Sequence, residues 1–123
     1  MRGGARAPTL GRTWEARAAQ FLGEKGMRII SRGYRCRLGE IDIIGVDGTA
    51  LVVVEVRARA SGDSAIETIG SNKRRRIVNA TRHFLMRNPE WFSRRIRFDV
   101  IAIDRIDSTE PEIQWVRNAF DES

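Results

Sequence analysis

The sequence is poor in cysteine, in lysine and in long apolar runs. Cys36 is the only cysteine among 123 residues, which excludes an internal disulfide and a cysteine-based metal cluster. We interpret Cys36 as a structural thiol, because no conspicuous base accompanies it. No stretch approaches the roughly 20 apolar residues of a membrane span. The basic start, MRGGARAPTLGR, lacks the apolar core of a signal peptide. We therefore expect a soluble, cytoplasmic protein.

Length and composition predict a single domain. Hydrophobic residues make up 41% and aromatic residues 7% of the chain, which is typical of a globular protein rather than a disordered one. A chain of this length buries roughly 68% of its surface on folding. We expect residues 1–10 to form a flexible basic tail and residues 11–123 to form one domain.

Charge indicates the kind of partner. The chain has 22 lysines and arginines against 16 acidic residues, a net charge of +6. Lys25 and Lys73 are the only lysines, so the other basic residues are all arginines. A small basic domain attracts polyanions by releasing their counterions, which makes nucleic acid the expected partner. A basic surface that only meets solvent remains the alternative.

Periodicity predicts two helices and five strands. The first helix begins with Thr13 as N-cap and ends near Gly26, and the second extends from about Ser71 to Arg87. The predicted strands are 27–31, 39–45, 51–57, 95–104 and 112–120. The order α-β-β-β-α-β-β predicts an α/β fold, in which a mixed central sheet is flanked by helices.

Two carboxylates are expected to meet at the end of a hairpin. Side chains alternate faces along LVVVEVR, so Glu55 and Arg57 share one face. Asp47-Gly48 is a strong turn signal before this strand. A four-residue loop places Asp42 directly opposite Glu55, and a two-residue loop at 47–48 places it diagonally. Either register brings both acids to one face, whereas a three-residue loop separates them.

Acids at the end of an apolar hairpin need a counter-charge. Carboxylate oxygens suit Mg²⁺, which binds one or two carboxylates together with waters and substrate phosphate. Such an ion lowers the pKa of bound water and stabilises charge on a phosphodiester. The alternative is a structural salt-bridge cluster of Asp42 and Glu55 with Arg57 and Arg59. Spacing alone leaves both interpretations open.

Several segments resemble one known family. They are GRTWEARAAQFLGEKG, RCRLGEIDIIGVDG, LVVVEVRAR, NKRRRIVNATRHFL, RFDVIAID and IQWVRNAF. Together they are similar to the bacterial YraN-type family, whose members are predicted to be nuclease-like and resemble Holliday-junction resolvases. The resemblance implies a restriction-endonuclease-like αβββαβ core of the PD-(D/E)XK superfamily. It also implies an Mg²⁺- or Mn²⁺-dependent endonuclease acting on DNA, branched or single-stranded.

The resemblance also implies roles for particular residues. Asp42 and Glu55 match the metal-binding acids, and Glu15 matches an additional helix acid of resolvase-like members. Val56 would offer its backbone carbonyl to the metal. Arg57 departs from the pattern, because the family reads Glu-Val-Lys where this chain reads Glu-Val-Arg. Arginine stays charged and cannot act as a base, although it can stabilise transition-state charge.

Basic residues around the acids are the expected nucleic-acid contacts, namely Arg35, Arg37, Arg59, Lys73, Arg74, Arg75 and Arg76. We expect Lys73 to contact phosphate, with replacement of the missing motif lysine as the alternative. A non-catalytic nucleic-acid-binding module with a degenerate site is the rival function, and an interaction domain for an acidic protein is a third. By analogy with resolvases, a homodimer is plausible. Asp99, mid-strand among aliphatic residues, is expected to be the structural partner of an arginine.

Overall fold

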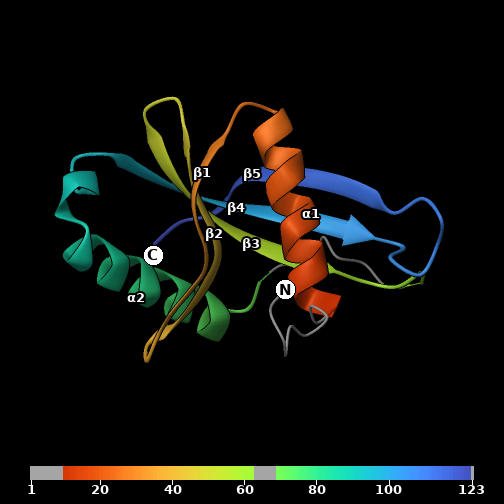
Figure 1. The fold of residues 1–123 in the computed structure, drawn as a ribbon. Helices are drawn as coiled ribbons and strands as arrows, with labels where there is room; N and C mark the ends of the chain where they lie inside the picture. Colours follow the sequence, from red (N-terminus) through yellow and green to blue (C-terminus); the bar gives the residue numbers. More distant parts are fainter. Residues whose placement is uncertain (1–9, 63–68, 123) are drawn as a thin grey trace, which may run out of the picture.

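A five-stranded mixed sheet with one helix on each face forms the structure (Figure 1). This computed structural model describes residues 10–62 and 69–122, so the predicted tail lies outside the described residues except for Leu10. Among the described residues, no helix is long and apolar enough to cross a membrane. The elements are α1 (Leu10–Glu24), β1 (Arg28–Cys36), β2 (Gly39–Asp47), β3 (Ala50–Ala58), α2 (Ser71–Arg87), the 3₁₀ turn η1 (Pro89–Trp91), β4 (Arg95–Asp104) and β5 (Glu112–Phe120).

The strands lie in the sheet in the order of the sequence, β1-β2-β3-β4-β5. All neighbouring pairs are antiparallel except β3 and β4, which are parallel. A parallel pair needs a crossover connection, and α2 lies on that crossover. The chain therefore leaves the end of β3, passes through α2 and returns to start β4. The predicted mixed sheet, with its αβββαβ order, is confirmed.

Alternation along β3 produces two cores. Val52 and Val54 pack with Ala18 and Leu22 of α1 on one face. Leu51 and Val53 pack on the opposite face, in the cluster that includes the buried residues of α2. Because Glu55 follows in the same alternation as Leu51 and Val53, its side chain belongs to the α2 face.

The hairpin between β2 and β3 has the first of the two registers considered from the sequence. Gly48 and Thr49 form the turn, Asp47 pairs with Ala50, and Gly48 adopts φ +63°, which glycine tolerates without strain. The ladder continues to Ile43 opposite Val54. One further step in this register places Asp42 opposite Glu55.

Sequence signals predicted the bounds of α2 correctly but not the start of α1. α2 begins at Ser71 and ends at Arg87, as predicted. The prediction for α1 was wrong at its start, because the helix begins at Leu10 and Thr13 lies inside it rather than capping it. An N-cap side chain contributes only about 1 kcal/mol, so it does not fix a helix end against a further turn.

Asp99 connects β4 to β5 from a fully buried position. Arg97 donates to both of its carboxylate oxygens at 2.9 Å. The indole Nε1 of Trp115 donates at 2.8 Å and the backbone N–H of Asn118 at 2.9 Å. Buried carboxylates are tolerated when they are paired and hydrogen-bonded in this way. The predicted role of Asp99 as an arginine partner is confirmed.

Candidate active site

Asp42 and Glu55 lie side by side at the ends of β2 and β3. The backbone N–H of Val56 donates to Asp42 Oδ2 at 2.8 Å, which fixes the Asp42 carboxylate across the strand ends. A side-chain interaction between the two acids also shifts the pKa of each. Glu55 is buried, and Asp42 is only partly exposed. The sequence prediction that both acids share one site is therefore met by the geometry.

The pair holds a proton more tightly than isolated acids do. Burial, followed by the neighbouring Asp42 charge, raises the pKa of Glu55 from 4.5 to about 7. Burial also raises the pKa of Asp42, against the lowering effect of the Val56 N–H bond and the side-chain interaction with Glu55. Two adjacent carboxylates cannot both ionise cheaply away from water. The site therefore favours a proton on the acid pair in the absence of another compensating charge.

Lys73 forms an ion pair with the acid pair. Its Nζ lies 3.1 Å from Glu55 Oε2, and it reaches the acid pair from the first turn of α2. The Lys73 side chain is 56% exposed, whereas that of Glu55 is 10% exposed. The ammonium is consequently anchored by the buried acid while remaining open to solvent and to an incoming ligand.

A cleft of about 320 Å³ opens beside the acids. Cationic side chains dominate its lining, and Gly70 lies at the start of α2 without a side-chain cap. The free backbone N–H groups of a helix start attract anions. The lining residues are Glu55, Val56, Arg57, Arg59, Ile69, Gly70 and Lys73. A negatively charged group in this cleft would lie between the acid pair and several positive charges.

Glu15 stands apart from the acid pair as a metal-binding group. Its Oε1 lies 3.9 Å from Arg32 Nε, beside Gly33 on β1. Within residues 10–62 and 69–122, no three His, Cys, Asp or Glu side chains are placed together to hold a metal ion. Glu15 is therefore not a preformed third ligand, and its metal role stays a prediction.

Comparison with known proteins identifies the family. The family model described as "Uncharacterised protein family UPF0102" matches residues 14–103. A UPF0102 protein of Alcanivorax borkumensis is 42% identical over 112 residues, covering 89% of this chain and 90% of the relative. A UPF0102 protein of Ectopseudomonas mendocina is 40% identical, covering 91% and 94%. The chain belongs to the UPF0102 family. This agrees with the YraN-type resemblance of its motifs.

In this UPF0102 chain, one cation occupies the position of the motif lysine and a second reaches the same acid from another element. Arg57 lies two residues after Glu55 and lines the cleft. Lys73 forms the ion pair with Glu55 from a different element. The sequence favoured a phosphate contact for Lys73 and kept replacement of the motif lysine as the alternative. The Lys73 ammonium contacts Glu55 directly and its side chain is 56% exposed, so both roles stay predictions.

The predicted nucleic-acid contacts divide into three places. Arg59 lines the cleft, although its Nη1 also donates to the Ala58 carbonyl at 3.0 Å. Arg35 and Arg37 are exposed on β1 and the adjacent turn, and they are not among the residues lining the cleft. The remaining arginines, Arg74, Arg75 and Arg76, follow Lys73 on α2. Ile69 and Gly70 also line the cleft but were missed, because no periodic pattern indicates where the start of α2 lies relative to the end of β3.

Proposed function

We propose that this UPF0102 protein is a metal-dependent endonuclease that cleaves DNA phosphodiesters, on branched or single-stranded DNA. The observation that carries the proposal is the paired, protonation-prone carboxylates of Asp42 and Glu55 beside a cleft lined by cations. Phosphoryl transfer depends on positioning and on stabilising negative charge, and these groups supply both. Membership of the UPF0102 family fits the nuclease-like resemblance of the motifs.

The donor atoms suit Mg²⁺ or Mn²⁺. Two carboxylates from adjacent strands offer oxygen ligands. Their raised pKa values mean that full ionisation of the pair is costly without a compensating positive charge, which a metal ion would supply. Asp42 and Glu55 would hold the ion, with the Val56 carbonyl as the predicted backbone ligand and Glu15 as a predicted further acid. When bound, the metal would activate water and offset charge on the phosphate.

The protein's own groups would position the substrate. The Val56 N–H holds one oxygen of Asp42 in place, so this acid needs little reorganisation. Arg57 and Arg59 would bind the phosphate entering the cleft, with guanidinium groups that remain charged throughout. The Lys73 ammonium, fixed by Glu55, would orient the attacking water and stabilise the developing negative charge.

A cleavage assay tests the proposal. Labelled linear, single-stranded and four-way-junction DNA are incubated with the protein and Mg²⁺ or Mn²⁺. We expect cleavage by the wild type, none by Asp42→Asn or Glu55→Gln, and a rate about 10²–10³-fold lower for Lys73→Ala. Lys25→Ala is the matched control, because Lys25 is the other lysine and its ammonium lies over the Phe21 ring. It should retain full activity.

Arg57→Lys distinguishes a site in which Lys73 is the required ammonium from a site that Arg57 has silenced. If Lys73 serves as the site ammonium, Arg57→Lys should change the rate only slightly. Cleavage that appears only in Arg57→Lys would instead mean that Arg57 silences an otherwise intact site. Retained DNA binding without cleavage in every variant would refute the endonuclease and support the non-catalytic binding module.

A further inference from the structure

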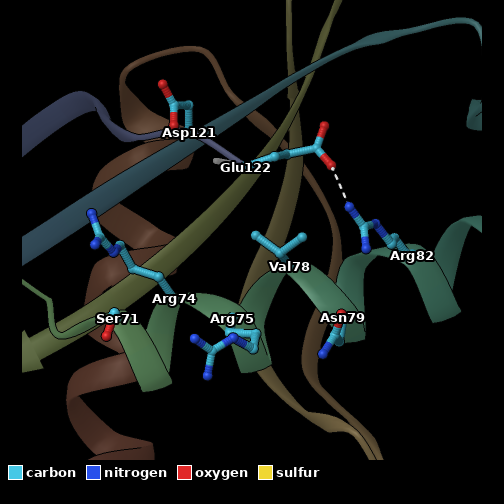
Figure 2. Close-up of a pocket in the computed structure, with 8 residues that line it drawn as sticks. All are labelled: Ser71, Arg74, Arg75, Val78, Asn79, Arg82, Asp121 and Glu122. Atoms are coloured by element: carbon cyan, nitrogen blue, oxygen red, sulfur yellow. Dashed lines mark hydrogen bonds and ion pairs between the residues drawn. The ribbon is translucent and has the colours of Figure 1, made fainter.

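A second hollow of about 270 Å³ lies on another side of α2 (Figure 2). Its α2 residues follow one helical stripe, with an approximate spacing of three to four residues, and its other side is formed by the segment after β5. The lining residues are Ser71, Arg74, Arg75, Val78, Asn79, Arg82, Asp121 and Glu122. Below, this hollow is called the α2 groove. From Ser71 to Arg82 it follows roughly 16 Å of helix, at 1.5 Å per residue.

The α2 groove already holds a carboxylate against an arginine. Glu122 Oε1 lies 3.4 Å from Arg82 Nη2, the contact drawn as a dashed line in Figure 2. Both side chains are largely exposed, at 63% for Arg82 and 56% for Glu122, so water screens the pair strongly. Arg74 and Arg75 form no salt bridge within the part of the chain that the structure describes. Of the three arginines that line the groove, only Arg82 therefore forms a salt bridge within the described residues.

The α2 groove and the active-site cleft adjoin the same turn of helix. Gly70 and Lys73 line the cleft, whereas Ser71 and Arg74 line the groove. A chain of phosphates that enters the cleft would therefore meet Arg74 of the groove within one turn of α2. Three arginines and two short polar side chains are the groups that usually contact DNA phosphates.

We propose that the α2 groove binds a nucleic-acid backbone, and that Glu122 occupies Arg82 until a phosphate displaces it. This inference rests on the proposed function, because it extends the path of the same substrate beyond the cleft. Glu122 acts as an internal competitor and lowers nucleic-acid affinity. Removing its charge makes Arg82 available for a phosphate contact.

Binding of fluorescein-labelled DNA, followed by anisotropy in EDTA, tests this without any cleavage. One additional phosphate contact strengthens binding by up to about 8-fold at 0.1 M salt and steepens the salt dependence by about one. Glu122→Gln should tighten binding toward this limit, and Arg82→Ala should weaken binding and flatten the salt dependence. Because both variants act on the same Arg82 contact, their salt dependences should differ from each other by about one. Circular dichroism checks that each variant folds.

A second exposed ion pair supplies matched controls. Arg105 Nη2 lies 3.2 Å from Glu112 Oε2, with side chains 49% and 69% exposed, and neither residue lines either hollow. Glu112→Gln and Arg105→Ala make the same charge changes as the test variants. They should alter affinity by less than half as much. In an Arg82→Ala background, Glu122→Gln should lose its gain.

Equal effects of Glu122→Gln and Glu112→Gln would overturn the inference, as would an undiminished gain in the Arg82→Ala background. Absence of DNA binding by every variant would overturn it too. The endonuclease proposal is tested separately, by cleavage with Mg²⁺ or Mn²⁺. If the wild type cleaves DNA but Glu122→Gln has no specific effect on affinity, only the groove proposal is refuted. If Glu122→Gln gains affinity but the wild type does not cleave DNA, only the endonuclease proposal is refuted.

Discussion

Replacing Glu55 with glutamine should stabilise the metal-free protein at alkaline pH. Burial and the adjacent Asp42 raise the pKa of Glu55 from 4.5 to about 7. The folded protein therefore binds a proton that the unfolded chain releases between these two values. By linkage, the free energy of unfolding is highest below pH 4.5 with respect to this group and falls as pH rises through 7. Glutamine is neutral at every pH and removes this dependence.

The size of the effect follows from the same change in pKa. At about 1.4 kcal/mol per pKa unit, ionising Glu55 costs the folded protein about 3 kcal/mol at pH 9. The attraction of Lys73 is already included in this cost, because Lys73 lowers the pKa of Glu55 against the larger effect of burial. The net stabilisation expected for Glu55→Gln at pH 9 is therefore about 3 kcal/mol. At pH 4.5 the two proteins should differ by less than about 1 kcal/mol.

Urea denaturation between pH 4.5 and 9 in EDTA measures this directly. The control is Glu112→Gln, which makes the same chemical change at a largely exposed glutamate. Its stability should follow that of the wild type across the whole range. The reasoning is refuted if the free energy of unfolding of Glu55→Gln has the same pH dependence as that of the wild type, or if the variant becomes less stable relative to the wild type as pH rises.

The same measurement with Mg²⁺ or Mn²⁺ connects stability to the proposed metal site. A ligand that binds only the folded state adds about 1.4 kcal/mol at ten times its Kd. At pH 8 we expect this gain for the wild type and a smaller one for Glu55→Gln, which lacks one charged ligand. An equal gain in both proteins would mean that the ion binds elsewhere.

Two further substitutions test the framework around the site. Asp99→Asn should lower the free energy of unfolding by about 3 kcal/mol in urea denaturation, because Arg97 loses its buried counter-charge and Trp115 loses a carboxylate acceptor; a loss below about 1 kcal/mol would contradict this. Gly39→Ala should cost about 1–3 kcal/mol, because its φ is +158° and an added Cβ would lie 2.8 Å from the Arg76 carbonyl oxygen. An unchanged urea midpoint for Gly39→Ala would show that α2 can shift away from the turn before β2.

The sheet was predictable because its signals are local. Alternation in β3 assigned each valine to a face, and the Asp47-Gly48 signal located the turn, but the sequence left two registers open. The pairing of Asp47 with Ala50 selects the register that places Asp42 opposite Glu55, and either register would have brought both acids to one face. The start of α1 was not predictable, because Thr13 suits both an N-cap and the first turns of a longer helix.

The sequence predicted that Lys73 lies on the second helix, but it did not predict the contact of Lys73 with Glu55. Its contact with Glu55 depends on where the start of α2 lies relative to the end of β3, and no periodicity within one element describes that placement. The hydrogen bond between His83 Nδ1 and the Tyr34 hydroxyl is a second contact of this kind. Both contacts join residues far apart in sequence, which a pattern within one element does not indicate.

The position of Lys73 changes how the arginine in Glu-Val-Arg is interpreted. A motif that assigns the cation to the strand would count Arg57 as a defect. The first turn of α2, however, supplies an ammonium 3.1 Å from Glu55. In the function we propose, that group would serve the acid pair, and Arg57, which lines the cleft, would contact phosphate with a guanidinium that never loses its charge. This division of roles between strand and helix would follow from the parallel crossover, which brings the start of α2 to the end of β3.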